Sequence, residues 1–213
     1  MADAEKSKAP KTKESKTQEQ RREESEKQML KAAITLFARQ GYLKTTLSEV
    51  GKEAGYTAGL VSHKFGSKEG LLQAVVTHIS QRFLGDQLGE SIKQNSATES
   101  ISNYLDIYLR EVSLREGPIR ALYVIMGEAL GAVPEVRKPI AEMNAGARDI
   151  LKKIVTTGIE QKEFRADLDP DAAAALIIGA LRGLVMQHLL DPRRVNLKNM
   201  RSTVRATVLA SLQ

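Results

Sequence analysis

One short stretch of the sequence combines small, hydroxyl-bearing and basic side chains. Residues 57–64 read TAGLVSHK. Ala58 and Leu60 could contact the methyl groups of thymine, and Ser62 or His63 could hydrogen-bond a base edge or a phosphate. Readout of this kind requires the side chains to lie near the N-terminal end of a helix that enters the major groove. Leu60 has a second interpretation, as an ordinary core residue, and the sequence leaves both open.

Two short helices and a tight turn are expected to position this stretch. Thr46 is a favourable N-cap and Glu49 completes a capping box, so a helix starts at Leu47. Gly55 stands where the chain turns, a position that favours a residue tolerant of positive φ. Thr57 caps the next helix, which is too short to be stable alone. A short helix that is held by its predecessor and presented to a partner is the helix-turn-helix arrangement.

Positive charge is concentrated around this segment. The chain of 213 residues has a net charge of +6. Residues 29–70 hold six Lys or Arg against three Glu, whereas residues 71–213 hold 18 against 16 Asp or Glu. Excess positive charge near a helix-turn-helix suits a polyanion, although charge alone is equally compatible with a mildly basic soluble protein. Lys68, at the start of the next expected helix, is either a phosphate contact or an ordinary exposed lysine.

Residues suited to catalysis or metal binding form no recognisable group. The chain has no cysteine, which excludes disulfides, thiolate nucleophiles and cysteine-ligated metals. Its three histidines, His63, His78 and His188, lack the spacing of metal ligands, and neither a P-loop nor a nucleophile elbow occurs. We therefore expect no catalytic residue, no metal and no cofactor. A helical enzyme would need a cluster of convergent ionisable groups that the sequence does not offer.

Helical periodicity continues along the rest of the chain, and no strand pattern occurs. The apolar stripes and their breaks predict an all-α protein with nine helices. Residues 1–18 are mostly Lys, Glu, Ser, Thr and Gln, so we expect a disordered charged tail. Residues 19–70 are expected to form the helix-turn-helix domain and residues 71–213 a second helical domain. A polar connection is expected at 85–95, and Gly117-Pro118 is expected to break the chain between two helices.

Residues 172–190 form the most apolar window of the chain. Its length approaches that of a membrane span, but Arg182 in its middle would cost roughly 2.5–3.5 kcal/mol in lipid. We therefore expect a buried helix and no association with a membrane. Ala175, Gly179 and Gly183 repeat every four residues along it, a spacing that lets another helix approach closely. Packing within one subunit and pairing with a second copy both remain open.

Residues 29–72, MLKAAITLFARQGYLKTTLSEVGKEAGYTAGLVSHKFGSKEGLL, closely resemble the DNA-binding domain of tetracycline-repressor (TetR) family regulators. The matching pieces are AAITLFARQGY, TT before the second helix, EAGYTAG at the turn, KF, and SKEGLL at the start of the fourth helix. The resemblance implies a homodimer, a C-terminal helical domain that binds a small effector, and repression relieved by that effector. Three residues depart from the family pattern: Gly51 replaces Ala, Ser62 an aromatic residue, and Ala58 a Lys.

The resemblance also implies roles for individual residues. It makes Thr46 and Lys68 phosphate contacts and residues 57–64 the recognition helix. The residues expected to bind DNA are Thr46, Thr57, Ala58, Gly59, Leu60, Ser62, His63, Lys64 and Lys68. In the family the last two helices pair with their copies as a four-helix bundle. The residues expected at the dimer interface are therefore Ala175, Gly179, Gly183, Val204 and Val208.

An effector pocket follows from the resemblance, and the sequence indicates only its lining. Adaptable apolar and hydroxyl-bearing residues suit such a pocket, although each is also a candidate for ordinary core: His78, Tyr104, Tyr108, Tyr123, Met126 and Met143. We expect a ligand-responsive repressor of a palindromic operator. We place it in the cytoplasm, because the first residues lack the apolar run of a secretory signal. An alternative of a different class remains open: a DNA-bound structural or cell-cycle factor that recruits a protein and has no ligand.

Overall fold

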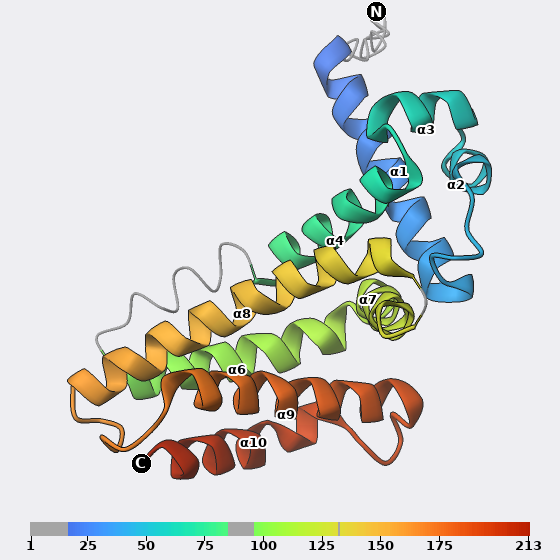
Figure 1. Ribbon diagram of the computed structural model, residues 1–213. Helices are drawn as coiled ribbons and strands as arrows, with labels where there is room; N and C mark the ends of the chain where they lie inside the picture. The colour runs from blue at the N-terminus through green and yellow to red at the C-terminus, as the bar shows by residue number, and fades with distance from the viewer. Residues whose placement is uncertain (1–16, 85–95, 132) are drawn as a thin grey trace, which may run out of the picture.

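The structure, a computed structural model, describes residues 17–84, 96–131 and 133–213. Over these ranges it contains nine α-helices and no strand, which confirms the predicted all-α class. The helices are α1 (Gln18–Gln40), α2 (Leu47–Ala54), α3 (Ala58–Phe65), α4 (Lys68–Leu84), α6 (Ala97–Leu114), α7 (Glu116–Ala129), α8 (Pro134–Glu160), α9 (Pro170–Leu190) and α10 (Leu197–Leu212). Figure 1 shows α2 and α3 at one end of the molecule and α9 and α10 along the opposite side.

Three helices, α6, α7 and α8, begin before the apolar stripes that predicted them. The expected break at Gly117 and Pro118 lies inside the first turn of α7, and α8 opens with Pro134. Proline is tolerated in the first turn because the first N–H groups of a helix have no partner within it. The first turns of these helices carry little apolar periodicity, which is why the sequence suggested later starts.

The end of the expected charged tail belongs to α1. Thr17 Oγ1 accepts the N–H of Gln20 at 3.2 Å, and Gln20 Oε1 accepts the N–H of Thr17 at 2.9 Å. This capping box starts the helix at Gln18, inside the range that composition assigned to disorder. The remainder of the expected tail, residues 1–16, and the expected connection at 85–95 lie outside the described residues.

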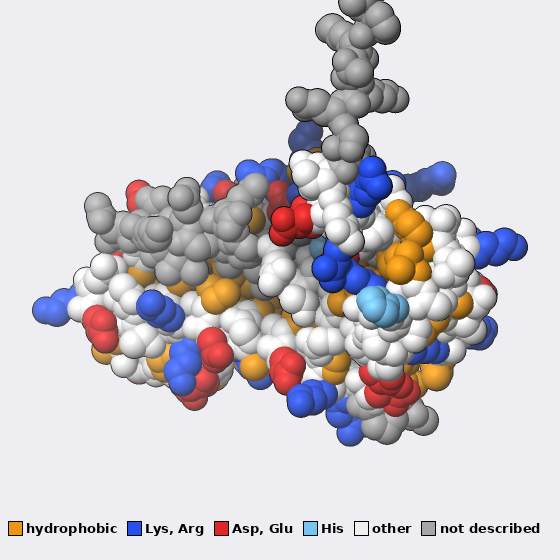
Figure 2. Space-filling view, turned by 90° about the horizontal axis from the view of Figure 1, so that it is seen from above, with side chains coloured by type: hydrophobic (Ala, Val, Ile, Leu, Met, Phe, Trp, Pro, Cys, Tyr) orange, Lys and Arg blue, Asp and Glu red, His pale blue; other side chains and the backbone are white. Residues whose placement is uncertain are grey.

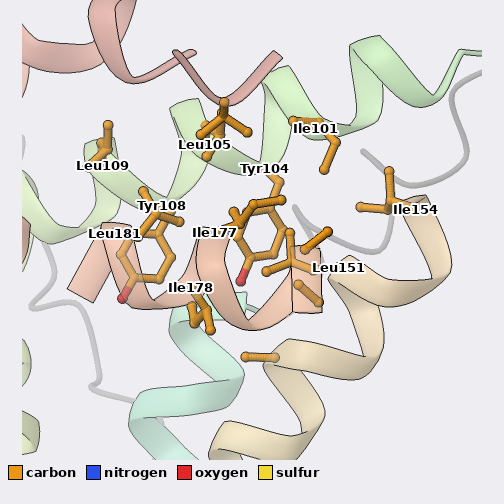
Figure 3. Packing of buried hydrophobic residues seen from close by; sticks show 14 of the residues in the cluster. Ile101, Tyr104, Leu105, Tyr108, Leu109, Leu151, Ile154, Ile177, Ile178 and Leu181 are labelled. Atoms are coloured by element: carbon orange, nitrogen blue, oxygen red, sulfur yellow. The ribbon is translucent and has the colours of Figure 1, made fainter. Parts of the chain in front are cut away.

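Buried apolar side chains form two clusters. The first cluster joins α1–α4 to α7 and the start of α8, and it contains Phe37, Tyr42 and Leu71. The second cluster is built mainly by α6, the later part of α8, α9 and α10, with Tyr104 and Tyr108 among its members (Figure 3). The first cluster crosses the predicted boundary between residues 70 and 71. Packing therefore groups α4 and α7 with the helix-turn-helix.

A carboxylate on α7 holds the corner that follows α1. Glu128 accepts the backbone N–H of Tyr42 at 2.8 Å and that of Leu43 at 3.1 Å. Gly41 precedes them with φ of 81°, and a Cβ atom there would lie 2.5 Å from Glu128 Oε1. Glycine therefore leaves room for the carboxylate as well as adopting the positive φ. The chain that leads into α2 is fixed by a side chain far away in sequence.

Candidate functional site

The start of α2 is held by a capping box, as the sequence predicted. Thr46 Oγ1 accepts the N–H of Glu49 at 3.2 Å, and Glu49 Oε2 accepts the N–H of Thr46 at 2.8 Å. Hydrogen bonds from Thr46, and then from Gln40, lower the pKa of the Glu49 carboxyl below its ordinary value. Thr46 remains exposed, so a hydroxyl-bearing side chain stands at the surface beside the fixed first turn of α2.

Two glycines shape the turn between α2 and α3. Gly55 adopts the left-handed conformation, with φ of 77° and ψ of 28°, as expected of the residue that ends α2. A Cβ atom at Gly51 would lie 2.8 Å from the carbonyl oxygen of Tyr56 and 3.0 Å from the carbonyl carbon of Thr57. An alanine there would force the backbone to shift. The glycine that departs from the family pattern therefore allows a closer turn, in exchange for weaker helix propensity.

One face of α3 is presented to solvent. Thr57 caps the helix by accepting the N–H of Leu60 at 3.2 Å, and Val61 anchors it with 0% exposure. The predicted base-reading residues and their neighbours are exposed together: Thr57, Ala58, Gly59, Leu60, Ser62 and His63. Leu60 is 42% exposed, so it is not a core residue of this subunit. Figure 2 views the molecule from this end and shows Lys and Arg side chains distributed over the face.

The two lysines predicted to bind DNA already have partners within the chain. Lys64 Nζ lies 2.6 Å from Glu26 Oε2 of α1. Lys68 Nζ donates to the carbonyl of Leu43 at 3.0 Å and lies 4.3 Å from the centre of the Tyr42 ring. Burial, followed by nearby carboxylates, raises the pKa of Tyr42 to about 12. Both lysines therefore brace the helix-turn-helix, a role that the sequence did not predict. Because an ammonium group has three N–H donors, each lysine could also donate to a phosphate.

Several residues that support α3 gave no distinct signal in the sequence. The Tyr56 hydroxyl donates to Gln28 Oε1 at 2.8 Å, which ties the turn to α1. A Cβ atom at Gly70 would overlap the carbonyl oxygen of Phe65, so glycine lets the start of α4 pack against the end of α3. Gln28 and Glu26 lie in a polar part of α1, and only the folded arrangement reveals that they face the helix-turn-helix.

The residues expected to line an effector pocket lie in two separate places. Four of them border a space of about 20 Å³ between α4, α6, α7, α8 and α9: Tyr108, Tyr123, Met126 and Met143. Tyr104 packs beside Tyr108 with ring centres 6.2 Å apart (Figure 3). His78 instead lines a cavity of about 490 Å³ against α1. The structure therefore brings the tyrosines and methionines together and separates the histidine from them.

Polar groups are buried around this small space. Burial raises the pKa of Tyr104, Tyr108 and Tyr123 above the ordinary tyrosine value. The Tyr123 hydroxyl donates to the carbonyl oxygen of Arg182 at 3.0 Å. The Tyr104 hydroxyl has no hydrogen-bond partner within the described part of the chain, which is uncommon for a buried polar group. The second cluster thus contains hydrogen-bonding capacity that the protein itself does not use.

The small residues expected at the dimer interface lie on an exposed face of α9. This α9 face comprises Ala172, Ala175, Leu176, Gly179, Ala180, Gly183, Met186 and Leu190. A Cβ atom at Gly179 or Gly183 would meet nothing within 4 Å, so their small size serves no packing inside the described part of the subunit. Val208 is 8% exposed and Val204 is partly buried against the same second cluster. Contrary to expectation, these valines offer little surface to a second copy, because the apolar stripe of α10 packs on α6.

The sequence predicts neither a metal site nor a membrane span. In the described ranges, no group of three or more His, Asp or Glu is placed to hold a metal ion. α9 is long and apolar enough to cross a membrane by length and composition alone. One side of it, which includes Ile177 and Leu181, is nevertheless buried in the second cluster. Core helices of soluble proteins can have the same length and apolar composition.

The sequence and the fold both have known relatives. Residues 29–75 match "Bacterial regulatory proteins, tetR family", and residues 98–213 match "BetI-type transcriptional repressor, C-terminal". The fatty acid metabolism regulator protein of Bacillus subtilis (strain 168) is 26% identical over 178 residues, which cover 83% of this chain and 90% of that protein. The structure of FadR from Bacillus subtilis in complex with stearoyl-CoA has a TM-score of 0.76 at 24% identity, over 88% of this chain and 100% of that one. A transcriptional regulator from Saccharomonospora viridis in complex with choline has a TM-score of 0.75 at 20% identity, over 89% and 98% of the two chains.

The two family matches divide the chain in sequence, although α7 and the start of α8, which the second match covers, pack in the first cluster. The first spans the capped and braced helix-turn-helix, and the second spans α6 to α10 and more than half of the chain. The solved structures share the arrangement of the helices along almost their whole length. The chain therefore belongs to the TetR family of bacterial transcriptional regulators.

Proposed function

We propose that this regulator represses transcription by binding a palindromic operator as a homodimer, and that a small-molecule effector releases it. The observation that carries the proposal is the exposed face of α3, where Thr57, Ala58, Leu60, Ser62 and His63 lie together beyond a capped helix start. Small and short polar side chains in this position suit the floor of the major groove. Ala58 and Leu60 would contact thymine methyls, and Ser62 or His63 would hydrogen-bond base edges or phosphates.

Phosphate contacts would set the orientation of α3. Thr46 is exposed at the start of α2, and Lys68 opens α4. Helix N-termini attract phosphates because their free N–H groups and dipoles point outward. Lys68 would use the donors that remain beside its bond to Leu43, and Lys64 would exchange its bond to Glu26 for a phosphate or remain a brace. In either role the two lysines keep positive charge beside the base-reading face.

A second copy would cover the exposed face of α9. Leu176, Met186 and Leu190 are 66%, 54% and 80% exposed in the single chain. Contiguous exposed apolar surface of this kind is uncommon on a monomer, and the open space over Gly179 and Gly183 admits a second helix at close range. The exposed side of α10, rather than Val204 and Val208, would complete a four-helix contact.

The effector would bind where the two clusters meet, among Tyr104, Tyr108, Tyr123, Met126 and Met143. The space there is about 20 Å³, roughly enough for one water molecule, so an effector must displace side chains to enter. Methionine side chains adapt readily, and the unpartnered Tyr104 hydroxyl would gain a hydrogen bond. Relatives of this fold hold ligands as unlike as stearoyl-CoA and choline, so effector chemistry does not transfer from them. Their occupancy by small molecules favours this function over a structural factor without a ligand.

The same proposal assigns no catalysis and no cofactor, and it places the protein in the cytoplasm, where the DNA lies. The test is selection of binding sites from random duplexes by the full-length protein, followed by footprinting. Two α3 helices related by a two-fold axis should recover palindromes whose half-sites lie about one helical turn apart, roughly 34–36 Å, or a multiple of it. Recovery of asymmetric single sites alone, or the absence of specific sites, would refute the proposal.

A further inference from the structure

A second cavity lies where α1 meets α4 and the turn into α7. Its volume is about 490 Å³, which falls within the roughly 300–1,000 Å³ of small-molecule sites. Five of its lining residues come from α1, so it borders the DNA-binding part of the molecule. We call it the joint cavity, and its lining is Lys27, Lys31, Ile34, Thr35, Ala38, His78, Ile79, Arg115, Gly117, Pro118 and Ile119.

Isoleucine side chains from three elements form the floor of the joint cavity. Ile34 of α1, Ile79 of α4 and Ile119 of α7 are 8%, 3% and 2% exposed. Ala38 and Pro118 extend the apolar lining. A hydrocarbon group on this surface would leave water and contact rigid, already buried neighbours. The floor therefore selects a ligand with an apolar body.

The rim of the joint cavity is positively charged. Lys27, Lys31 and Arg115 contribute to the lining, and none of the lining residues is acidic. Lys27 Nζ lies 3.9 Å from Glu23 in an exposed pair, which contributes little energy and is easily exchanged. Glu111, 5% exposed, fixes Arg115 through a bond of 2.7 Å from Nε. Glu111 also lies 3.7 Å from Arg110. The exposed ammonium groups of Lys27 and Lys31 supply the positive charge of the rim.

We propose that the joint cavity binds an amphipathic anion, with its apolar body over the isoleucine floor and its carboxylate or phosphate head at Lys27 and Lys31. The site is distinct from the tyrosine-lined space where the two clusters meet, because no lining residue other than Ile79 borders both. The inference does not depend on DNA binding or on the effector proposed above. It rests on the pairing of an apolar floor with a cationic rim in one concave site.

A ligand in the joint cavity would act directly on the helix that supports α3. The same α1 carries Glu26, which holds Lys64, and Gln28, which holds Tyr56. A ligand that fits α1 differently in the DNA-bound and free states must change operator affinity, because the two binding free energies are linked. The joint cavity is therefore placed where a bound ligand could couple to DNA binding through α1.

Binding of four probes with one alkyl chain tests the proposal: decanoate, decyl phosphate, decanol and decyltrimethylammonium. Calorimetry on the full-length protein, below the concentrations at which the probes form micelles, should show that both anions bind more tightly than the alcohol and that the cation does not bind. The Lys27→Gln/Lys31→Gln variant should lose roughly three- to tenfold in affinity for the anions and keep its affinity for decanol. Decanoate and decyl phosphate compared with each other identify the preferred head group.

Two further variants locate the binding. Lys138→Gln/Lys153→Gln removes the same charge from exposed positions of α8 that do not line the cavity, and it should bind the anions like the parent. Thr35→Phe, at an exposed position of the lining, should block all binding without unfolding the protein. The proposal would be overturned if the four probes bound with equal affinity. It would also be overturned if the anions bound as tightly to the Lys27→Gln/Lys31→Gln and Thr35→Phe variants as to the parent. A protein that binds duplex DNA specifically but none of the probes would refute this inference alone.

Discussion

The two exposed helices α3 and α9 differ in how their uncovered faces are built. The free face of α3 consists of small and polar side chains with one leucine, and its support is polar: Thr57 caps it, Tyr56 bonds to Gln28, and Lys64 pairs with Glu26. The free face of α9 is apolar and small, and beneath it lies a core in which the Tyr104 hydroxyl has no partner within the described residues. One face suits a hydrated polyanion and the other suits a copy of itself.

The difference teaches how each helix obtains its geometry. Directional hydrogen bonds hold α3 at defined angles, as base reading requires, because a small rotation would misplace every side chain that faces the groove. α9 is held by apolar packing, which tolerates adjustment among neighbouring side chains. Equivalent substitutions in α3 and α9 should therefore differ in their effects on DNA binding and on stability.

The largest expected effect comes from Gly183→Leu on the α9 face. A bulky side chain where two backbones approach typically costs about 1–3 kcal/mol by overpacking, and a two-fold interface repeats each contact. The variant should shift toward monomer in sedimentation and lose most of its operator affinity with α3 untouched. Gly146→Leu, at another exposed helical glycine with open space around it, is the control and should remain dimeric. A dimeric Gly183→Leu protein with normal DNA binding would place the interface elsewhere.

The next largest effect should distinguish a residue that positions α3 on the phosphates from a residue that reads bases. Lys68→Ala should weaken binding to all duplexes alike and reduce the slope of log affinity against log salt by about 0.9 for each phosphate that is no longer neutralised. It should also destabilise the subunit, because Lys68 bonds to Leu43 and lies over Tyr42. Leu60→Ala should change the preferred sequence and leave the salt slope nearly constant. Equal shifts of slope in both variants would refute this division of roles.

Removal of the N-caps compares the two helices directly. Thr57 accepts one N–H at the start of α3, and Asp169 accepts those of Asp171 and Ala172 at the start of α9. Replacing either with alanine should cost about 1 kcal/mol in the free energy of unfolding, measured by urea denaturation. Only Thr57→Ala should also lower operator affinity, because only α3 needs its N-terminal turn at the DNA. An equal loss of affinity from Asp169→Ala would mean that the starts of both helices matter alike.

The stability of the fold in acid should depend on a carboxylate that lies outside both α3 and α9. Hydrogen bonds from Thr98, with Ser96 and Ala97, lower the pKa of Glu163 to about 2. Because this pKa is depressed in the folded state, the stabilisation is present above the ordinary value of 4.5 and is lost as pH falls toward 2. Glu163→Gln should flatten the pH dependence of unfolding over that window. Glu160→Gln, at an exposed position of α8, should leave the dependence as it is in the parent.

The smallest effect should come from a pair of tyrosine hydroxyls. Tyr56→Phe removes the bond to Gln28 below α3 and should cost about 0.5–1.5 kcal/mol in unfolding free energy. Tyr104→Phe removes a buried hydroxyl without a partner in the described ranges, so stability should stay constant or rise, since no hydrogen bond is removed. Thermal denaturation of both variants tests the pair. A larger loss for Tyr104→Phe would show that its hydroxyl is satisfied in solution.

Local chemistry explains what could be predicted from the sequence. The caps at Thr46 and Thr57 and the turn at Gly55 depend on neighbours a few residues away, so spacing alone was enough to place α2 and α3. Apolar periodicity likewise predicted the nine helices of the described residues. The helix starts were less accurate, because polar first turns and a first-turn proline such as Pro118 give no periodic signal.

Long-range packing explains what could not be predicted. An apolar stripe on α10 shows that one side is covered, but not whether α6 or a second copy covers Val208. In the same way, the positive charge of Lys64 and Lys68 was readable, whereas their partners Glu26 and Leu43 lie in other elements. His78 was grouped with the tyrosines because composition cannot distinguish two cavities. Each of these placements depends on how helices far apart in sequence meet.

The hydrogen bonds from the corner after α1 to Glu128 make local opening measurable by hydrogen exchange. The amide protons of Tyr42 and Leu43 are both held by that one carboxylate, so each exchanges with solvent deuterium only after its bond to Glu128 opens. Their exchange rates report how often these two hydrogen bonds open, on the timescale of local opening. Two backbone positions would therefore measure how firmly α7 holds the chain that leads into α2, without any ligand, operator or label.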